Sequence, residues 1–155
     1  MADNQNFDQS MLTKLQTLLE IEEIKNLRLR YAQYLDGNRI DEMHEVFTKD
    51  ATVKVTVGQM NGLDEIKMGL KQAYKDFDRD GRGFYPFMHA TVNHNVRLLG
   101  PNEARGTCYL IDFETASKVD PNPLLLLGLY SDIYRREDGK WRISSSVLDV
   151  TWPNQ

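Results

Sequence analysis

A chain of 155 residues with 41% hydrophobic content is long enough to bury one core, and we predict a single domain over residues 1–155. Its 23 acidic and 19 basic residues give a net charge of −4 and are scattered, so no basic stripe is available to neutralise a nucleic-acid backbone. The longest apolar run, PLLLLGLY, is far shorter than the ~20 residues that cross a bilayer. We therefore expect neither a nucleic acid nor a membrane as a partner.

The cellular compartment is indicated by two features of the sequence. The single cysteine, Cys108, excludes an internal disulfide framework. The first ten residues, MADNQNFDQS, lack the cationic start, the apolar stretch and the cleavage pattern of a secretory signal. We expect a cytoplasmic protein.

The first half of the chain carries mostly helical patterns. From Met11 to Leu35, apolar residues recur in steps of three and four and define one helical stripe. Residues 38–47, NRIDEMHEVF, predict a second, shorter helix, and residues 63–77 again have helical spacing. Between these two segments, residues 51–57, ATVKVTV, alternate apolar and polar side chains, as a half-buried strand does.

The second half of the chain predicts strands. Four segments are rich in β-branched and aromatic residues and are separated by turn sequences: 87–99, 103–115, 123–137 and 140–152. Four sequential strands imply an antiparallel meander. Because helices gather at the front and strands at the back, we predict an α+β fold with the helices on one face of a curved sheet.

Alternation along residues 87–99 sorts the side chains of this strand into two rows. The odd row holds His89, Thr91, Asn93 and Asn95, and the even row holds Met88, Ala90, Val92, His94, Val96 and Leu98. The odd row is either a solvated face, which periodicity alone favours, or the polar wall of a pocket. His94 stands alone among apolar residues, which favours a hydrogen-bonded core or interface histidine.

No metal site is predicted. His89 and His94 are five residues apart, so on a strand they point to opposite faces and cannot share a metal ion. Residues 76–81 imitate the start of a calcium loop, but the twelfth position, where a bidentate glutamate is required, is Phe87. This segment is interpreted as a polar surface loop.

Asp36 closes the first predicted helix, within the sequence YAQYLDGN. A helical wheel places it off the main stripe but beside a weaker apolar strip formed by Leu29 and Ala32. The residues alone leave two interpretations open. Asp36 is either a solvated residue at a helix end, which the pattern favours, or a carboxylate at the mouth of an apolar cleft. In such a cleft, desolvation and a histidine partner would tune it for acid–base chemistry.

Three blocks of sequence, in this order, resemble the SnoaL-like branch of the nuclear-transport-factor-2-like superfamily. They are IEEIKNLRLRYAQYLDGNRIDEMHEVFTKDATV, HATVN and GLYSDIYRREDGKWRIS. The branch includes scytalone dehydratase, hexachlorocyclohexane dehydrochlorinase, polyketide cyclases and the bile-acid 7α-dehydratases, which the first block particularly resembles. The resemblance implies a cone-shaped fold in which about three N-terminal helices pack on a strongly curved mixed or antiparallel sheet and enclose a pocket.

The same resemblance implies a set of site residues. In these enzymes, an aspartate at the end of the first helix and a histidine early in the strand after the third helix form an acid–base dyad. By motif position these match Asp36 and His89, and the pocket tyrosine of the bile-acid enzymes matches Tyr31. The odd row of residues 87–99 would then face the pocket and His94 would not. We expect the substrate-binding residues to be Tyr34, Thr91, Asn93, Cys108 and Tyr130.

The function implied by the resemblance is that of a cofactor-independent lyase, specifically a dehydratase, acting on a small cyclic or polycyclic hydrophobic substrate. His89 would be the base, Asp36 would orient it, and Tyr31 would bind a substrate oxygen. Two alternatives stay open: an isomerase or polyketide cyclase with Asp36 as the base, and a non-catalytic small-molecule-binding or assembly module. The apolar excess in PLLLLGLY and SVLDVTW predicts a homodimer or homotrimer.

Overall fold

The computed structural model describes residues 8–115 and 123–153. Its helices are α1 (Gln9–Asp36), the short 3-10 helix η1 (Ile40–Glu45) and α2 (Leu63–Phe77). Its strands are β1 (Phe47–Val55), β2 (Gly58–Asn61), β3 (Phe87–Leu98), β4 (Glu103–Glu114), β5 (Leu124–Glu137) and β6 (Lys140–Trp152).

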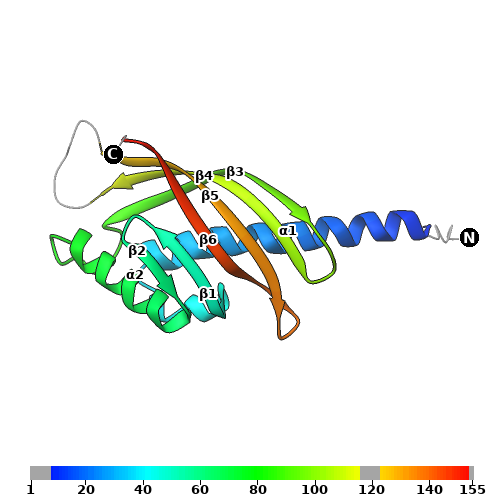
Figure 1. Cartoon of the computed structure of the whole chain (residues 1–155). Coiled ribbons are helices and arrows are strands. Elements are labelled where there is room, and N and C mark those ends of the chain that lie inside the picture. The colour runs from blue at the N-terminus through cyan, green and yellow to red at the C-terminus, as the bar shows by residue number, and fades with distance from the viewer. Residues whose placement is uncertain (1–7, 116–122, 154–155) are drawn as a thin grey trace, which may run out of the picture.

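All the strands belong to one six-stranded sheet in the order β2-β1-β6-β5-β4-β3. Strands β3 to β6 form an antiparallel meander, whereas β1 joins β6 in parallel, so the sheet is mixed. The sheet is curved, α1 runs along one of its faces against β3 and β6, and α2 lies beside β1 and β2 (Figure 1). The α+β fold with helices on one face of a curved sheet is confirmed.

Helix α1 is exposed along its first turns and buried against the sheet along its later ones. It begins at the cap residue Asp8, whose carboxylate accepts a hydrogen bond from the Met11 backbone N–H at 2.8 Å. Its first turns project beyond the sheet (Figure 1), and Leu15 and Leu18 are exposed there. The helix enters the core only at Ile24. The predicted helix is confirmed, and its apolar stripe is buried only from Ile24 onward.

Two other elements differ from the prediction. The expected second helix is the six-residue 3-10 helix η1, and the strand expected at 51–57 begins at Phe47 and is followed by a turn to β2. Strand β2 has four residues and buries only Met60, which is too short a pattern to show alternation. The helix at 63–77 and the four strands of the second half are confirmed.

A β-bulge in β3 reverses the two rows of this strand. The pairing with β4 shifts register between Val92 and Asn95, and Asn93 adopts a left-handed backbone with φ of 54°. One extra residue moves every later side chain to the opposite face. His89 therefore faces inward as predicted, but Asn93 is exposed and His94 faces the core. The inward position predicted for Asn93 is therefore wrong, whereas His94 is a hydrogen-bonded histidine outside the pocket, as predicted.

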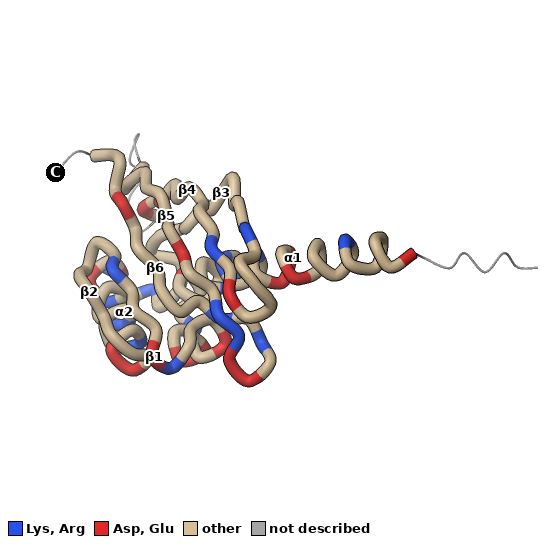
Figure 2. Tube along the Cα trace, turned by 45° about the vertical axis from the view of Figure 1, so that its right-hand side comes forward, with Lys and Arg blue, Asp and Glu red and all other residues tan. Residues whose placement is uncertain are grey.

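Residues of both charge signs are scattered along the chain of the body (Figure 2). Helix α1 has few charged residues along its projecting first turns (Figure 2). Within the described ranges, no helix is long and apolar enough to cross a membrane.

Candidate active site

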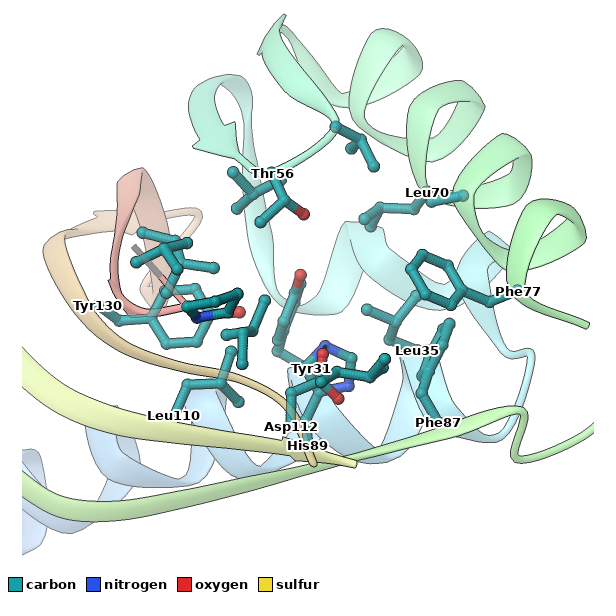
Figure 3. Close-up of a pocket in the computed structure, with 18 residues that line it drawn as sticks. Tyr31, Leu35, Thr56, Leu70, Phe77, Phe87, His89, Leu110, Asp112 and Tyr130 are labelled. Atoms are coloured by element: carbon teal, nitrogen blue, oxygen red, sulfur yellow. Dashed lines mark ion pairs between the residues drawn. The ribbon is translucent and has the colours of Figure 1, made fainter. Parts of the chain in front are cut away.

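A pocket of about 290 Å³ lies between the two α-helices and the inner face of the sheet. Its walls are mostly apolar, with Leu35 from α1 and with Leu70 and Phe77 from α2. A few polar side chains also line it, and Tyr31, His89 and Asp112 lie together at one end (Figure 3). These polar lining residues are Tyr31, Thr56, His89, Asp112 and Tyr130. An apolar pocket with a few convergent polar groups is the usual form of a small-molecule site.

Asp36 and His89 are in direct contact at the base of this pocket. The Oδ1 atom of Asp36 lies 2.6 Å from Nδ1 of His89, and Oδ2 accepts a hydrogen bond from the backbone N–H of His89 at 2.9 Å. Both oxygens of Asp36 are thus engaged by one residue. The contact depends on where two elements end and begin, because Asp36 is the last residue of α1 and His89 is near the start of β3.

This contact fixes the tautomer of the neutral His89 ring. An ionised carboxylate only accepts hydrogen bonds, so Nδ1 carries the proton and Nε2 is left with a free lone pair. His89 lines the pocket, whereas Asp36 lies behind it and does not. The pair therefore presents a basic nitrogen to the pocket, supported by a buried carboxylate.

The pKa of His89 is set by opposing effects. Burial lowers it, but the hydrogen bond with Asp36 and the negative charges of Asp112 and Asp36 outweigh burial, so the pKa is raised above its ordinary value. The side chain is only 10% exposed, which keeps these charges poorly screened. His89 is consequently a stronger base than a free histidine.

Asp112 is a second pocket carboxyl, which the sequence analysis missed. It lies on β4 directly opposite His89, and its Oδ2 is 3.9 Å from Nε2 of His89. Its Oδ1 is buried without a hydrogen-bond partner in the described part of the chain. Burial, together with the charge of Asp36 and partly opposed by His89, raises the pKa of Asp112 to about 6. A fraction of Asp112 is therefore protonated near neutral pH and can donate a proton.

Tyr31 and Tyr130 are two further polar residues of the pocket lining, and Tyr31 lies next to His89. Their side chains share a hydrogen bond, and their ring centroids are 6.3 Å apart in an edge-on arrangement. Figure 3 shows Tyr31 beside His89 and Asp112, with Tyr130 across the pocket. Burial raises the pKa of Tyr31 to about 12, so its hydroxyl stays protonated and is available to donate a hydrogen bond to a substrate oxygen.

Comparison with known protein families assigns the fold. The model of the SnoaL-like domain matches residues 16–147, which is most of the chain. The chain belongs to the SnoaL-like family. No curated protein matches this SnoaL-like chain in sequence.

Solved structures share the fold of this SnoaL-like protein at low identity. An NTF2-like protein with a cystatin-like fold from Novosphingobium aromaticivorans is 18% identical, with a TM-score of 0.80 over 97% of this chain and 94% of that one. A putative scytalone dehydratase from the same organism is 24% identical, with a TM-score of 0.72 over 87% and 86%. The structure of LinA is 13% identical, with a TM-score of 0.68 over 91% and 90%. These likenesses are ones of fold.

The other predicted substrate-binding residues of this SnoaL-like protein do not line the pocket, with Tyr130 as the exception. The Tyr34 hydroxyl donates a hydrogen bond to Glu45 at 2.5 Å, outside the pocket. Thr91 shares the inner row of β3 with His89 but lies beyond the lining, and Asn93 is turned outward by the bulge. Cys108 is buried in the core, and burial raises the pKa of its thiol to about 11.

The sequence did contain a signal for Asp112. Strand β4 buries alternate residues from Ala104 onward, and Asp112 ends this row of small and apolar side chains: Ala104, Gly106, Cys108, Leu110 and Asp112. A carboxylate on the buried row of an otherwise apolar strand requires a reason, because burying a charge without a partner is costly. The alternation in this strand could therefore have identified Asp112.

Proposed function

We propose that this SnoaL-like protein is a cofactor-independent lyase that removes water from a small cyclic or polycyclic hydrophobic substrate. The observation that carries the proposal is the arrangement of His89 between Asp36 and Asp112 on the wall of an apolar pocket. Elimination of water needs a base for the carbon-bound proton, an acid for the leaving hydroxyl and a donor for the activating carbonyl. His89, Asp112 and Tyr31 supply these three groups.

The proposed reaction starts with neutral His89 and protonated Asp112. Nε2 of His89 removes the proton from the carbon next to the substrate carbonyl, and Asp36 stabilises the imidazolium that forms. The electrons of the broken C–H bond form the new double bond, while Tyr31 donates a hydrogen bond to the carbonyl oxygen. Asp112 protonates the hydroxyl, the C–O bond breaks and water leaves. Transfer of the proton from His89 to Asp112 restores the starting state.

The pocket favours a neutral substrate. Among the described residues that line it, none is lysine or arginine, whereas Asp112 lines it and Asp36 lies just behind. A substrate carboxylate or phosphate would face two carboxyl groups without a cation in contact, which is unfavourable. The apolar walls match a hydrocarbon ring system carrying a hydroxyl and a carbonyl. The fold shared with a putative scytalone dehydratase also supports dehydration.

The alternative in which Asp36 is itself the base of an isomerase or cyclase has less support. Both oxygens of Asp36 are hydrogen-bonded to His89, and Asp36 does not line the pocket. A general base must lie within hydrogen-bond reach of the proton that it removes. A base and a protonatable carboxyl side by side, both with shifted pKa values, are typical of a catalytic site, and this argues against a non-catalytic binding module.

The test is a mass-spectrometric screen of purified protein against hydroxylated steroids, polyketides and halogenated rings. We expect the loss of one water molecule from at least one hydroxylated ring substrate. Loss of a hydrogen halide would replace the dehydratase with a dehydrohalogenase, and a rearranged product of unchanged mass would replace it with an isomerase or cyclase. Binding without turnover across the panel would favour a binding module.

A further inference from the structure

A buried cation lies directly behind the two pocket tyrosines. Arg28 precedes Tyr31 by three residues on α1, so both side chains leave the same face of the helix. Arg28 is only 1% exposed, and its Nε donates a hydrogen bond to Oδ2 of Asp132 at 3.1 Å while Nη2 contacts Oδ1 of the same carboxylate. Nη2 also donates to Ser146 at 2.8 Å. A guanidinium held by this fork has one fixed orientation.

The guanidinium contacts the faces of both tyrosine rings. Its Cζ lies 3.9 Å from the ring centroid of Tyr130 and 4.9 Å from that of Tyr31, within the range of cation–π interactions. Arg28 itself does not line the pocket, whereas Tyr31 and Tyr130 do. The charge of Arg28 acts on both hydroxyls, since it works to lower the pKa of each against the dominant effect of burial. The positive end of the Arg28–Asp132 pair therefore faces the pocket tyrosines.

We propose that Arg28 is a positioning residue that fixes Tyr31 and Tyr130 and places a positive charge behind their hydroxyls, so that these bind a substrate oxygen carrying negative charge. The negative charges of Asp36 and Asp112 also act on Tyr31 and oppose such a charge, and the charge of Arg28 offsets them. This inference rests on the proposed function only in assigning that oxygen to the carbonyl of the substrate.

The same buried network provides a matched control. Asp132 also accepts a hydrogen bond from the Tyr134 hydroxyl at 2.8 Å, and Tyr134 in turn lies 3.0 Å from Nε2 of His94. Tyr134→Phe removes one partner of Asp132 and leaves the contact between Arg28 and the pocket tyrosines in place. This variant shows how the loss of one hydrogen bond to Asp132 affects ligand binding while Arg28 stays in place.

The test measures binding, so that it does not depend on turnover. The probes are 4-nitrophenolate, at a pH above its pKa, and neutral nitrobenzene, with affinities from fluorescence or calorimetry. The test variant is Arg28→Met with Asp132→Asn, which removes both charges and avoids an unpaired buried carboxylate. We expect the ratio of phenolate to nitrobenzene affinity to fall by about tenfold, because the variant removes an ion pair whose positive end contacts the tyrosines. Tyr134→Phe should keep the wild-type ratio.

Two results would overturn the role of Arg28: an unchanged ratio in the double variant, or an equal fall in Tyr134→Phe. If the double variant does not fold, Arg28→Lys takes its place, because an ammonium cannot lie flat against both rings or bind both oxygens of Asp132. The ratio should then fall by about threefold or more, and an unchanged ratio contradicts the proposal. If the phenolate preference depends on Arg28 but the protein shows no dehydratase turnover, the role of Arg28 stands and only the proposed function is refuted.

Discussion

Nε2 of His89 faces Oδ2 of Asp112 across 3.9 Å, on two neighbouring strands that place these residues directly opposite each other. This distance is too long for a hydrogen bond, so both groups stay available to bind a substrate. A base and a protonatable carboxyl are thus held side by side on one wall of the pocket. Their adjacency determines both the pH dependence and the stereochemistry of the proposed reaction.

We predict a bell-shaped pH dependence of kcat/KM. The active state holds one proton on the pair, with Asp112 protonated and His89 neutral, and it is lost when the pair gains a second proton or loses its only one. Burial raises the pKa of Asp112 to about 6, and the carboxylates hold the pKa of His89 above its ordinary value. The acid limb should therefore lie near pH 6 and the alkaline limb above it. A rate independent of pH across this range would contradict the assignment.

The variant Asp112→Asn should change the shape of this profile as well as its height. Without the acid, the rate should fall by ~10²–10⁴-fold. The residual rate needs only neutral His89, so it should rise with pH to a plateau without an alkaline limb. The midpoint of the rise should shift down, because the charge of Asp112 is one of the causes that raise the pKa of His89. Persistence of the alkaline limb would assign the acid to another group.

The same variant should stabilise the protein at neutral pH. The pKa of Asp112 is raised from 3.8 to about 6 by folding. As the pH rises through this window, the unfolded chain releases the proton while the folded chain keeps it, so the free energy of unfolding of the wild type falls. The loss amounts to roughly 2–3 kcal/mol above the window. Asp112→Asn has no carboxyl to titrate and avoids this loss. In urea denaturation, the variant should be more stable than the wild type near pH 7 and equally stable near pH 3.5. A variant no more stable than the wild type at pH 7 would contradict the raised pKa of Asp112.

The stereochemistry of elimination gives a third prediction. Because His89 and Asp112 lie on one wall, the proton and the hydroxyl should leave from the same face of the substrate ring, as a syn elimination. A substrate carrying deuterium on one face of the carbon next to the carbonyl tests this. Loss of deuterium only from the face that bears the hydroxyl is expected. Loss from the opposite face would place the base or the acid elsewhere.

The helices and strands could be predicted from periodicity, whereas the Asp36–His89 pair could be predicted only from family resemblance. The α1 pattern and the strand alternation are local, so helix 63–77 and strands β3 to β6 follow from periodicity. The pair did not follow from periodicity, which favoured a solvated Asp36. It followed from family resemblance, and the structure brings its atoms within 2.6 Å.

The parts that could not be predicted depend on single residues or on the tertiary surroundings. Asn93 creates a bulge that reverses the rows of β3, and a left-handed asparagine leaves no trace in an alternating pattern. The projecting start of α1 shows helical spacing whether or not a sheet lies against it, so Leu15 and Leu18 could not be separated from the core residues. The contact between Arg28 and Asp132 joins residues 104 positions apart, and no local pattern reports such a distance.

The predicted homodimer or homotrimer needs an exposed surface on which a second copy binds. The projecting turns of α1 expose an apolar stripe, defined as Met11, Leu12, Leu15, Leu18 and Leu19. Leu15 precedes the buried Ile24 by nine residues, about 180° around the helix axis, so the stripe faces away from the sheet of its own chain. Leu12, Leu15 and Leu19 have the spacing of a two-helix seam, so we expect the same stripe of a second copy to cover it.

The double variant Leu15→Glu with Leu19→Glu tests this contact. In sedimentation velocity at micromolar concentration, the wild type should sediment as an oligomer and the variant as a monomer of 18.0 kDa. Met68→Glu, at an exposed apolar site on α2, is the control and should leave the oligomer intact. A monomeric wild type, or a variant that sediments unchanged, would contradict the role of the stripe.

The most direct test of the acid–base assignment is kcat for water elimination by Asp36→Asn and His89→Gln, compared with Tyr34→Phe, which lies outside the pocket. Unfolding temperatures should show that all three variants are folded. The account predicts that kcat falls by ~10²–10⁴-fold in both dyad variants and stays near the wild-type value in Tyr34→Phe. Undiminished kcat in folded Asp36→Asn or His89→Gln would contradict the assignment of His89 as the base and Asp36 as its support.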